Sequence, residues 1–396
     1  MKAASKTQGT RKRLAVFLDG TWNAVSDNTN VWRLRALCST KDTGNPAQLA
    51  YYDIGVNGMV GGAFGKGLLR NITDAYEWLV ENYSDGDEIF VFGFSRGAFT
   101  ARSLTGFVTK CGLLKPGAPL SVNQLFARYR RRDAHTIWAL QSDEKQGNPT
   151  SLNLEERWML KYSRAVPIKL VGVWDTVGAL GIPAFSWEGI SRSSFRFLDT
   201  GLRLPIENAF HVVAIDEHRK AFMPTLWTKR LPNDPQAVIA ASRPYNSVEQ
   251  RWFVGAHANV GGGCQNDLLA QAPLKWIVGK ARSLGLEFRA EIEVDDGAVD
   301  APISDSYREF MRGAYSRIGG RHHRPIGVPP GRDPNATYIN VNEMIDASVF
   351  ERYRHSEDYR PPNLSDWSQR KNVDLNTLSA SVSVDDPSLE IADDQK

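Results

Sequence analysis

The chain has 396 residues, 42% of them hydrophobic and 23% charged, a balance that indicates a folded globular protein with a large buried core. Its formal net charge is only +3, from 48 basic and 45 acidic residues, so charge gives no indication of a nucleic-acid partner. The three cysteines have unrelated spacings, which argues against a disulfide framework and against a paired-cysteine metal site.

The N-terminal part predicts an arm followed by strands. Residues 1–13 are polar and basic, and we expect them to form a flexible arm. Residues 14–18 are a short, fully apolar run that ends at Asp19-Gly20, the pattern of a strand buried on both faces of a parallel sheet. A second extended stretch is predicted over 49–54.

A glycine-rich loop and a helix come next. The loop is expected over 55–67, and from 72 to 83 apolar side chains recur at helical spacing, with Asn71 placed as the N-cap. The apolar stretch 89–92 then predicts a strand that runs straight into Gly93-Phe94-Ser95-Arg96-Gly97, and a helix follows. Strand, glycine-flanked turn and helix, in this order, are the context of a nucleophile elbow.

Three further apolar strands each end close to a side chain that is capable of chemistry. They are 168–174, before Asp175; 211–215, before Asp216; and 252–254, shortly before His257 and Gly261-Gly262-Gly263. Strands that alternate with helical stretches predict an α/β fold with a doubly wound, mostly parallel sheet. In such sheets the chemistry lies at the carboxyl ends of the strands, so we expect these side chains and Ser95 to meet at one edge.

We interpret residues 14–369 as one α/β-hydrolase domain with two insertions. The first insertion, at about 115–165, is longer than a simple crossover needs and is expected to be helical and to form a cap. The second lies at about 286–340. Residues 370–396 are rich in Ser and Asp with little periodicity, which predicts an extended or disordered tail.

The elbow predicts that Ser95 is a nucleophile. A serine hydroxyl reacts poorly near neutral pH unless it has a base, a group that orients the base, and donors for the developing oxyanion. The backbone N–H of Arg96, at the start of the following helix, is the expected first oxyanion donor, and the N–H of Gly20 or Thr21, in the loop beside the elbow, is the second. The same turn also suits a serine that caps a helix, but the chain order Ser, Asp, His favours catalysis.

His257 is the favoured base, because it follows a strand and precedes three glycines that can fold tightly over a site. Two aspartates are candidates for the acid. Asp175 is enclosed by apolar residues, where a carboxylate needs a specific partner such as an imidazole N–H. Asp216 precedes a charged run typical of a salt-bridged helix start, so Asp175 is favoured and Asp216 is the alternative.

Two other readings of the glycine-containing loops fail on their chemistry. A strand followed by Asp19-Gly20-Thr21 also occurs in haloacid-dehalogenase-type phosphatases, but these need an aspartate nucleophile two positions earlier, where this chain has Phe17. The glycines at 61–67 lack the Gly-Lys-Ser/Thr ending of a phosphate-binding loop. We therefore expect neither a metal nor a cofactor.

Five longer motifs carry a resemblance to a known family. They are Leu18-Asp19-Gly20-Thr21-Trp22-Asn23, Tyr52-Asp53-Ile54-Gly55-Val56, Gly93-Phe94-Ser95-Arg96-Gly97-Ala98, Gly172-Val173-Trp174-Asp175-Thr176-Val177 and Trp252-Phe253-Val254-Gly255-Ala256-His257. The chain from about 12 to 280 resembles the α/β-hydrolase family that contains the phospholipase effectors of bacterial type VI secretion systems, lipase effector class 1, and uncharacterised bacterial and fungal relatives. The resemblance implies a triad of Ser95, Asp175 and His257 that acts on lipid esters. The family usually has an aspartate in the stretch after this histidine, where the chain has Ala258-Asn259.

The expected function is hydrolysis of carboxylic esters, in particular lipid or phospholipid acyl esters, by a Ser-His-Asp acyl-enzyme mechanism. Two alternatives stay open: a non-catalytic binding module on a hydrolase scaffold, and a serine hydrolase for a non-lipid acyl substrate. The segment 126–133 interleaves arginines with apolar residues, which predicts either peripheral contact with an anionic membrane surface or a solvated basic helix face. The sequence does not indicate an oligomeric state.

The cellular location is also an expectation from the sequence. No stretch reaches the roughly 20 apolar residues that span a bilayer, and the N-terminal residues do not have the pattern of a signal peptide. We therefore expect a protein that is cytoplasmic as synthesised and that would leave the cell only through a dedicated secretion system.

Overall fold

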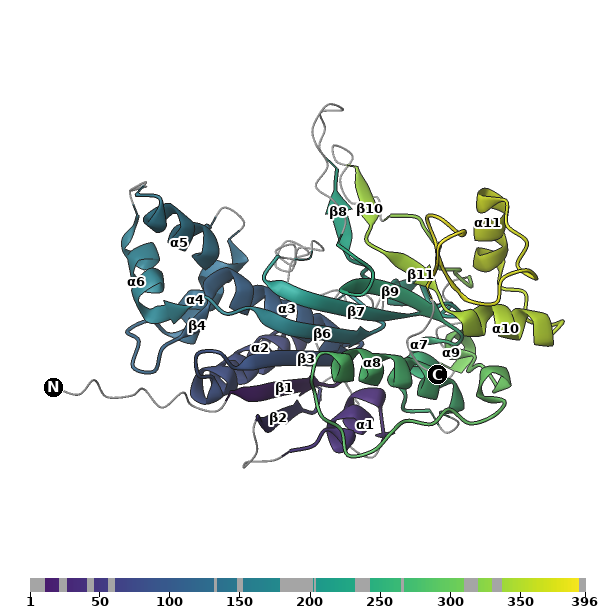
Figure 1. Cartoon of the computed structure of the whole chain (residues 1–396), viewed down its shortest axis with the longest axis horizontal. Helices are drawn as coiled ribbons and strands as arrows, with labels where there is room; N and C mark the ends of the chain where they lie inside the picture. The colour runs from purple at the N-terminus through teal and green to yellow at the C-terminus, as the bar shows by residue number, and fades with distance from the viewer. Residues whose placement is uncertain are drawn as a thin grey trace.

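The sheet at the centre of the molecule is mostly parallel. The computed structural model describes residues 11–20, 27–40, 46–55, 61–131, 134–147, 152–178, 202, 204–231, 243–264, 267–309, 320–329 and 337–391, with only the backbone of 61–66. Within these ranges nine strands form one sheet in the order β13-β12-β11-β9-β7-β6-β3-β1-β2 (Figure 1). From β2 to β11 neighbouring strands pair in parallel, and β12 and β13 add an antiparallel edge. The predicted α/β class with a mostly parallel sheet is confirmed.

The strands of this sheet are short and mostly apolar. They are β1 Lys12–Leu18, β2 Ala47–Asp53, β3 Glu88–Phe94, β6 Ile168–Trp174, β7 Ile206–Ala214, β9 Val248–Phe253, β11 Glu343–Ile345, β12 Ser381–Ser383 and β13 Glu390–Ile391. A separate antiparallel pair joins β8 Thr228–Arg230 to β10 Tyr338–Asn340.

Helices cover both faces of the sheet. The longer ones are α1 Asn30–Leu37, α2 Gly61–Asn82, α3 Arg96–Cys111, α8 Gln271–Ser283, α10 Ala347–His355 and α11 Pro362–Lys371. On β1, Val16 packs into a core with α2 and α3, whereas Phe17 packs on the other face with α1 and α8. Because both faces of the strand are buried from Leu14 to Leu18, these five residues are a continuous apolar run without polar alternation.

The strand order reverses between β1 and β3. The chain passes from β1 to β2 on one side and then returns to β3 on the other side of β1. Open parallel sheets bind their ligands beyond the carboxyl ends of the strands at such a switch point. Asp19 follows β1 and Ser95 follows β3, so the topology places both residues there.

The first insertion lies at the amino edge of the sheet, away from Ser95. Helix α3 begins beside Ser95 and runs back to the amino edge, where β4 Leu113–Leu114 pairs with β5 Ser163–Arg164. Helices α4 Val122–Arg130, α5 Ile137–Lys145 and α6 Leu154–Tyr162 lie between these two strands. Figure 1 shows them at one end of the sheet and helix α7, His257–Gly261, at the other. The structure therefore contradicts the expected cap for the insertion at 115–165.

The apolar side chains of the basic segment in this insertion pack inward, whereas Arg130 and Arg131 are exposed. In α4, Phe126 and Tyr129 are buried against Phe107 of α3, and Arg128 is only 2% exposed because it pairs with Glu155 and neighbouring Glu156. Their burial contradicts the expected lipid-facing side of segment 126–133, whose last two residues lie outside the described ranges. None of the helices that the structure describes is long and apolar enough to cross a membrane.

The C-terminal residues belong to the sheet as far as Ile391. Strands β12 and β13 lie within 370–396, Val382 and Val384 are fully buried, and the Trp367 indole N–H donates to the Val384 carbonyl at 3.0 Å. The prediction of a separate extended or disordered tail is therefore wrong for these residues. Residues 392–396 lie outside the described ranges.

Two element boundaries near the N-terminus also differ from the prediction. Strand β1 starts at Lys12, inside the expected arm, of which residues 1–10 are not described. Helix α2 starts at Gly61, so Asn71 lies within the helix and not at its N-cap. The Asn71 side chain instead donates to the carboxylate of Asp53, at the end of β2, at 2.9 Å.

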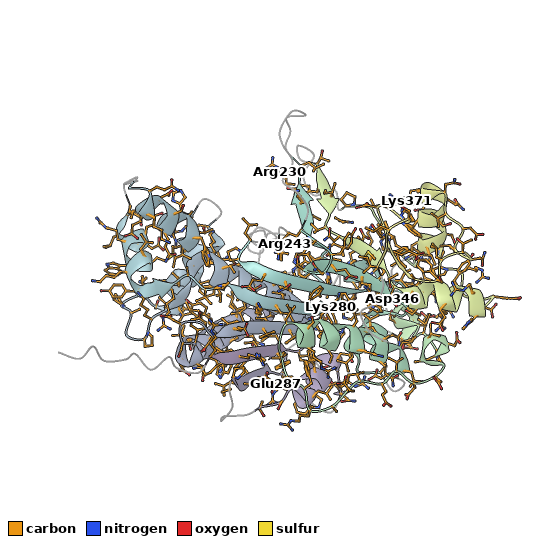
Figure 2. The ribbon with its side chains drawn as sticks, viewed as in Figure 1. Arg230, Arg243, Lys280, Glu287, Asp346 and Lys371 are labelled. Atoms are coloured by element: carbon orange, nitrogen blue, oxygen red, sulfur yellow. The ribbon has the colours of Figure 1, made fainter. Side chains whose placement is uncertain are left out.

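A buried ion network ties the C-terminal helices to the sheet. Arg251 of β9 pairs with Glu249 at 2.5 Å and with Asp346, the N-cap of α10, at 3.2 Å. Lys280 of α8 approaches Glu249 at 3.6 Å, and Figure 2 labels both Lys280 and Asp346. Since a buried charge that loses its partner is costly, this network fixes α8 and α10 against β9.

Candidate active site

Ser95 occupies a strained turn between β3 and α3. Its backbone has φ 58° and ψ −119°, a conformation that a residue with a side chain rarely adopts, and its N–H donates to the Trp174 carbonyl at 3.0 Å. The side chain makes no capping hydrogen bond to α3, which argues against a purely structural N-cap serine. The turn presents the hydroxyl above the carboxyl edge of the sheet.

The glycines on both sides of Ser95 are required by space. A Cβ atom at Gly93 would lie 2.4 Å from the carbonyl oxygen of Gly97, and one at Gly97 would lie 2.1 Å from the carbonyl oxygen of Leu18. Real Cβ atoms essentially never approach backbone atoms so closely. The elbow therefore packs directly against the end of β1.

His257 lies within hydrogen-bond distance of Ser95. Its Nε2 is 2.8 Å from the Ser95 Oγ, and its Nδ1 is 2.5 Å from the Asp175 Oδ2. His257 is the first residue of α7, His257–Gly261, and its ring lies between Phe94, at 4.7 Å, and Phe222, at 5.1 Å. Both aromatic rings therefore pack against the imidazole.

Asp175 follows β6 and is fully buried. Its Oδ1 accepts hydrogen bonds from the Ala214 N–H at 3.0 Å and from Arg324 Nη1 at 2.6 Å, and its Oδ2 accepts from Arg324 Nη2 at 2.9 Å. Burial alone would raise the pKa of Asp175, but the Arg324 charge and the His257 hydrogen bond outweigh it and hold that pKa well below its usual range. Asp175 is therefore a carboxylate near neutral pH.

The electrostatics of His257 favour a neutral imidazole. Burial lowers the pKa of His257 below its ordinary value of 6.5, although the hydrogen bond that its Nδ1–H donates to Asp175 acts in the opposite direction. A neutral ring whose Nδ1–H is held by Asp175 leaves Nε2 free to accept the Ser95 proton. This is the protonation state that a general base needs.

Asp216, the alternative acid, has a different position. Its Oδ2 accepts from the Gly255 N–H at 2.8 Å and from the Tyr359 hydroxyl at 3.1 Å. Burial raises the pKa of Asp216 to about 6. Asp216 thus holds the loop before His257, where Gly255 has φ 116°, whereas Asp175 contacts the ring itself.

The three expected oxyanion donors, Arg96, Gly20 and Thr21, differ in their hydrogen bonding and in whether the structure describes them. Arg96 is the first residue of α3, with its N–H at the helix N-terminus. The Gly20 N–H donates to the neighbouring Asp19 Oδ1 at 2.7 Å, and Thr21 lies outside the described residues. Asp19 is only 3% exposed, and its Oδ2 also accepts from Thr29 Oγ1 at 2.6 Å and Tyr52 Oη at 3.0 Å.

Three residues near His257 did not figure in the sequence predictions of the site. Arg324 holds Asp175, and Phe222 covers the imidazole. Glu217, fully buried, accepts from the His257 backbone N–H at 3.2 Å and forms an ion pair with Arg219 at 2.8 Å. The Asp216-Glu217 dipeptide gave a signal for charge near the site, but Arg324 lies in the second insertion with no local pattern that indicates a function.

Asn259 ties the second insertion to α7. It lies two residues after His257 and is only 1% exposed. Its Oδ1 accepts from the backbone N–H of Ala256 at 3.1 Å and of Ser304 at 3.0 Å, and its Nδ2 donates to the Ser304 Oγ at 3.1 Å. The asparagine amide fits this position because it accepts through Oδ1 and donates through Nδ2. Within the described ranges, no group of three or more His, Cys, Asp or Glu side chains could hold a metal ion.

Fold and site together define a class of protein: an α/β protein with a serine, a histidine and an aspartate in hydrogen-bond contact at the carboxyl edge of a parallel sheet. The model of one family matches residues 12–280, more than half of the chain. The chain belongs to this family, the type VI secretion system (T6SS) phospholipase effectors, Tle1-like, catalytic domain.

Individual relatives share less than a third of their residues with this chain over the aligned regions. The chain is 28% identical over 243 residues to the uncharacterized protein YEL023C of Saccharomyces cerevisiae, over 55% of this chain and 33% of that protein. The Tle1 effector bound to the VgrG spike from the type 6 secretion system has a TM-score of 0.33 and 17% identity, over 64% of this chain and 51% of that chain. An uncharacterized protein from Pseudomonas aeruginosa has a TM-score of 0.42 and 15% identity, over 81% of this chain and 56% of that chain. The chain thus spans a third of the yeast protein and about half of each solved chain.

Proposed function

We propose that this chain is a serine hydrolase of the α/β-hydrolase fold that cleaves carboxylic esters of lipids, phospholipid acyl esters in particular. The observation that carries the proposal is the chain of contacts from Ser95 Oγ to His257 Nε2, at 2.8 Å, and from His257 Nδ1 to Asp175 Oδ2, at 2.5 Å. The lipid substrate is supported by the family to which the chain belongs. Export by a dedicated secretion system, the route that the family name describes, is part of the same proposal.

The reaction has two stages, acylation of Ser95 and hydrolysis of the acyl-enzyme. His257 Nε2 takes the proton of Ser95 as its oxygen attacks the ester carbonyl, and Asp175 stabilises the imidazolium that forms. The imidazolium then protonates the leaving alcohol, and water releases the acyl group by the same route. The N–H of Arg96 and that of Gly20 or Thr21 would bind the oxyanion. Gly20 must exchange its bond to Asp19 for this, and one such donor contributes about 10²- to 10³-fold in rate.

The backbone of Ser95 argues against a non-catalytic binding module. A residue held at φ 58° in a sparsely populated region costs on the order of 1–3 kcal/mol, and such strain is typical of active sites. A module that only binds has no use for a serine hydroxyl held in this conformation against a buried imidazole. A non-lipid acyl substrate would use the same three side chains.

A substrate panel tests the proposal. Wild-type protein and Ser95→Ala are given short-chain esters, long-chain esters and phospholipid vesicles, and released acid is measured. We expect the wild type to release fatty acid from long-chain esters and phospholipid, and Ser95→Ala to release none. Hydrolysis of short esters alone would favour the non-lipid alternative, and no hydrolysis by a folded wild type would favour the binding module.

The buried position of His257 makes a prediction about the acid limb of the pH–rate profile. Activity requires the neutral imidazole, so it is lost as the pH falls through the pKa of His257. Because burial lowers that pKa, the midpoint of the acid limb of kcat/KM is expected below pH 6.5, the ordinary value for histidine. A pH–rate profile on a soluble ester checks this, and a midpoint above pH 6.5 would be the opposite result.

Gly97→Ala tests the geometry of the elbow. The new Cβ would lie 2.1 Å from the Leu18 carbonyl oxygen, so the turn must move. A displacement of about 1 Å can cost on the order of 10²-fold in rate, and overpacking costs about 1–3 kcal/mol of stability. We expect losses of this size in kcat and in the free energy of unfolding. The control is Gly320→Ala, where no atom lies within 4 Å of the new Cβ; equal behaviour of the two variants would refute the steric argument.

A further inference from the structure

We propose that Arg324 is a positioning residue of this active site, which holds the Asp175 carboxylate in place for His257. The inference rests on the proposed hydrolase function and adds a residue to it. Arg324 lies beyond residues 12–280, the part of the chain that the family model matches. It belongs to the second insertion, at about 286–340.

The contact between Arg324 and Asp175 is a two-pronged ion pair. Nη1 donates to Oδ1 at 2.6 Å and Nη2 donates to Oδ2 at 2.9 Å, and neither residue is exposed to solvent. Such forked pairs fix the plane of the carboxylate as well as its charge. Oδ2 also accepts the His257 Nδ1–H at 2.5 Å, so the oxygen that orients the base is held directly by Arg324.

The Arg324 guanidinium also binds the backbone on either side of the site. Arg324 donates to the carbonyl of Ala214, at the end of β7, at 2.8 Å and to the carbonyl of Phe222. The Phe222 ring meets the His257 ring edge to face, at 5.1 Å and 75°. Arg324 therefore positions both the Asp175 carboxylate, which orients the imidazole, and Phe222, whose ring packs against it.

The C-terminal part of the chain positions Arg324 in turn. Asn363 of α11 donates its side-chain amide to the Arg324 carbonyl at 3.1 Å and to the Ile215 carbonyl at 3.0 Å. Asn363 is itself buried, at 5% exposure. Helix α11 thus supports the loop that reaches the site, which links residues outside 12–280 to the chemistry within them.

Removal of Arg324 should change the pH dependence of the reaction. Four charged groups lie around His257. Asp175 accepts from the ring, and Arg324 pairs with Asp175. Glu217 accepts from the backbone N–H of His257, and Arg219 pairs with Glu217. The Arg324 cation offsets the Asp175 charge and so weakens the stabilisation of the imidazolium. Without it, the imidazolium is favoured, and the acid limb of kcat/KM should move up by roughly one pH unit.

The experiment compares Arg324→Met and Arg324→Lys with Arg128→Met in the full-length protein. Arg128 is the matched control, because it is a buried arginine paired with Glu155 in the helical insertion at the opposite edge of the sheet. Ester hydrolysis across pH, the fluorophosphonate labelling rate and thermal unfolding are measured. We expect Arg324→Met to lose about 10- to 100-fold in kcat with KM unchanged, and to shift the acid limb upward. Arg324→Lys should keep the acid limb but lose about 10-fold in kcat, since lysine has no fork. Arg128→Met should lower only the melting temperature.

A folded Arg324→Met with the wild-type kcat and acid limb would overturn the proposal. If that variant does not fold, Arg324→Lys decides, and a wild-type kcat in this variant overturns the proposal as well. Failure of the proposed function looks different, because the wild type itself would then show neither turnover nor labelling at Ser95.

Discussion

Replacement of Ser95 by alanine is expected to reduce ester turnover by about 10⁴- to 10⁶-fold while the protein stays folded. The loss is large because the hydroxyl lies 2.8 Å from His257 Nε2, and the base has no proton to take without it. Stability should change little, because the Ser95 side chain makes no capping bond to α3 and alanine fits the same turn. Turnover of a soluble ester and the melting temperature of both proteins measure the two parts of this expectation.

Ser103→Ala is the matched control for this variant. Ser103 lies on the same helix, α3, is fully buried, and donates to the Phe99 carbonyl at 2.7 Å. Its removal deletes a buried hydroxyl without touching the site, so we expect turnover close to that of the wild type. Undiminished turnover in Ser95→Ala would show that the reaction does not pass through this serine.

Asp175→Asn is expected to lower kcat by about 10⁴-fold. An asparagine can present its amide N–H to His257 Nδ1, which favours the tautomer with the proton on Nε2, and this tautomer cannot accept the Ser95 proton. The variant also leaves the Arg324 guanidinium without its carboxylate, so stability should fall too, by several kcal/mol, as is usual for a broken buried pair. Steady-state kinetics and denaturant unfolding measure both effects.

Asp216→Asn separates the two candidate acids. The Gly255 N–H and the Tyr359 hydroxyl both donate to Asp216 Oδ2, and an amide oxygen at that position can accept both bonds. We expect a fall in kcat of no more than about tenfold, because the His257 ring keeps its Asp175 partner. If Asp216→Asn lost as much activity as Asp175→Asn, the assignment of the acid from the contact geometry would be untenable.

The strands and the central side chains could be read from the sequence because their signals are local. Apolar runs such as residues 14–18 and 170–174 became strands of the sheet that are buried on both faces. Parallel strands bring their carboxyl ends to one edge, so side chains far apart in sequence, Ser95, Asp175 and His257, were expected to meet, and they lie in contact.

The errors have physical reasons as well. The glycines at 61–67 suggested a loop, but the backbone there continues the helix that packs on the sheet at Leu68, Ile72 and Tyr76. The expected cap failed because α3 carries the chain to the opposite edge before the insertion begins. The strands β12 and β13 are three and two residues long, too short for a periodic signal.

Arg324 could not be found from the sequence at all. It is separated from Asp175 by 149 residues and lies among glycines, histidines and arginines that resemble an exposed loop. Only the folded chain, in which Asn363 and Ile215 hold this loop against β7, places the guanidinium beside the carboxylate. Long-range polar contacts of this kind have no periodicity, and so a pattern-based prediction misses them.

Covalent labelling of the intact protein with a fluorophosphonate, mapped by peptide mass spectrometry, tests the activation of Ser95 by His257 most directly. The wild type should carry one label on Ser95, and His257→Ala should react far more slowly although the serine is still present. A folded wild type that takes no label, or that reacts at Ser95 equally fast without His257, would contradict this account.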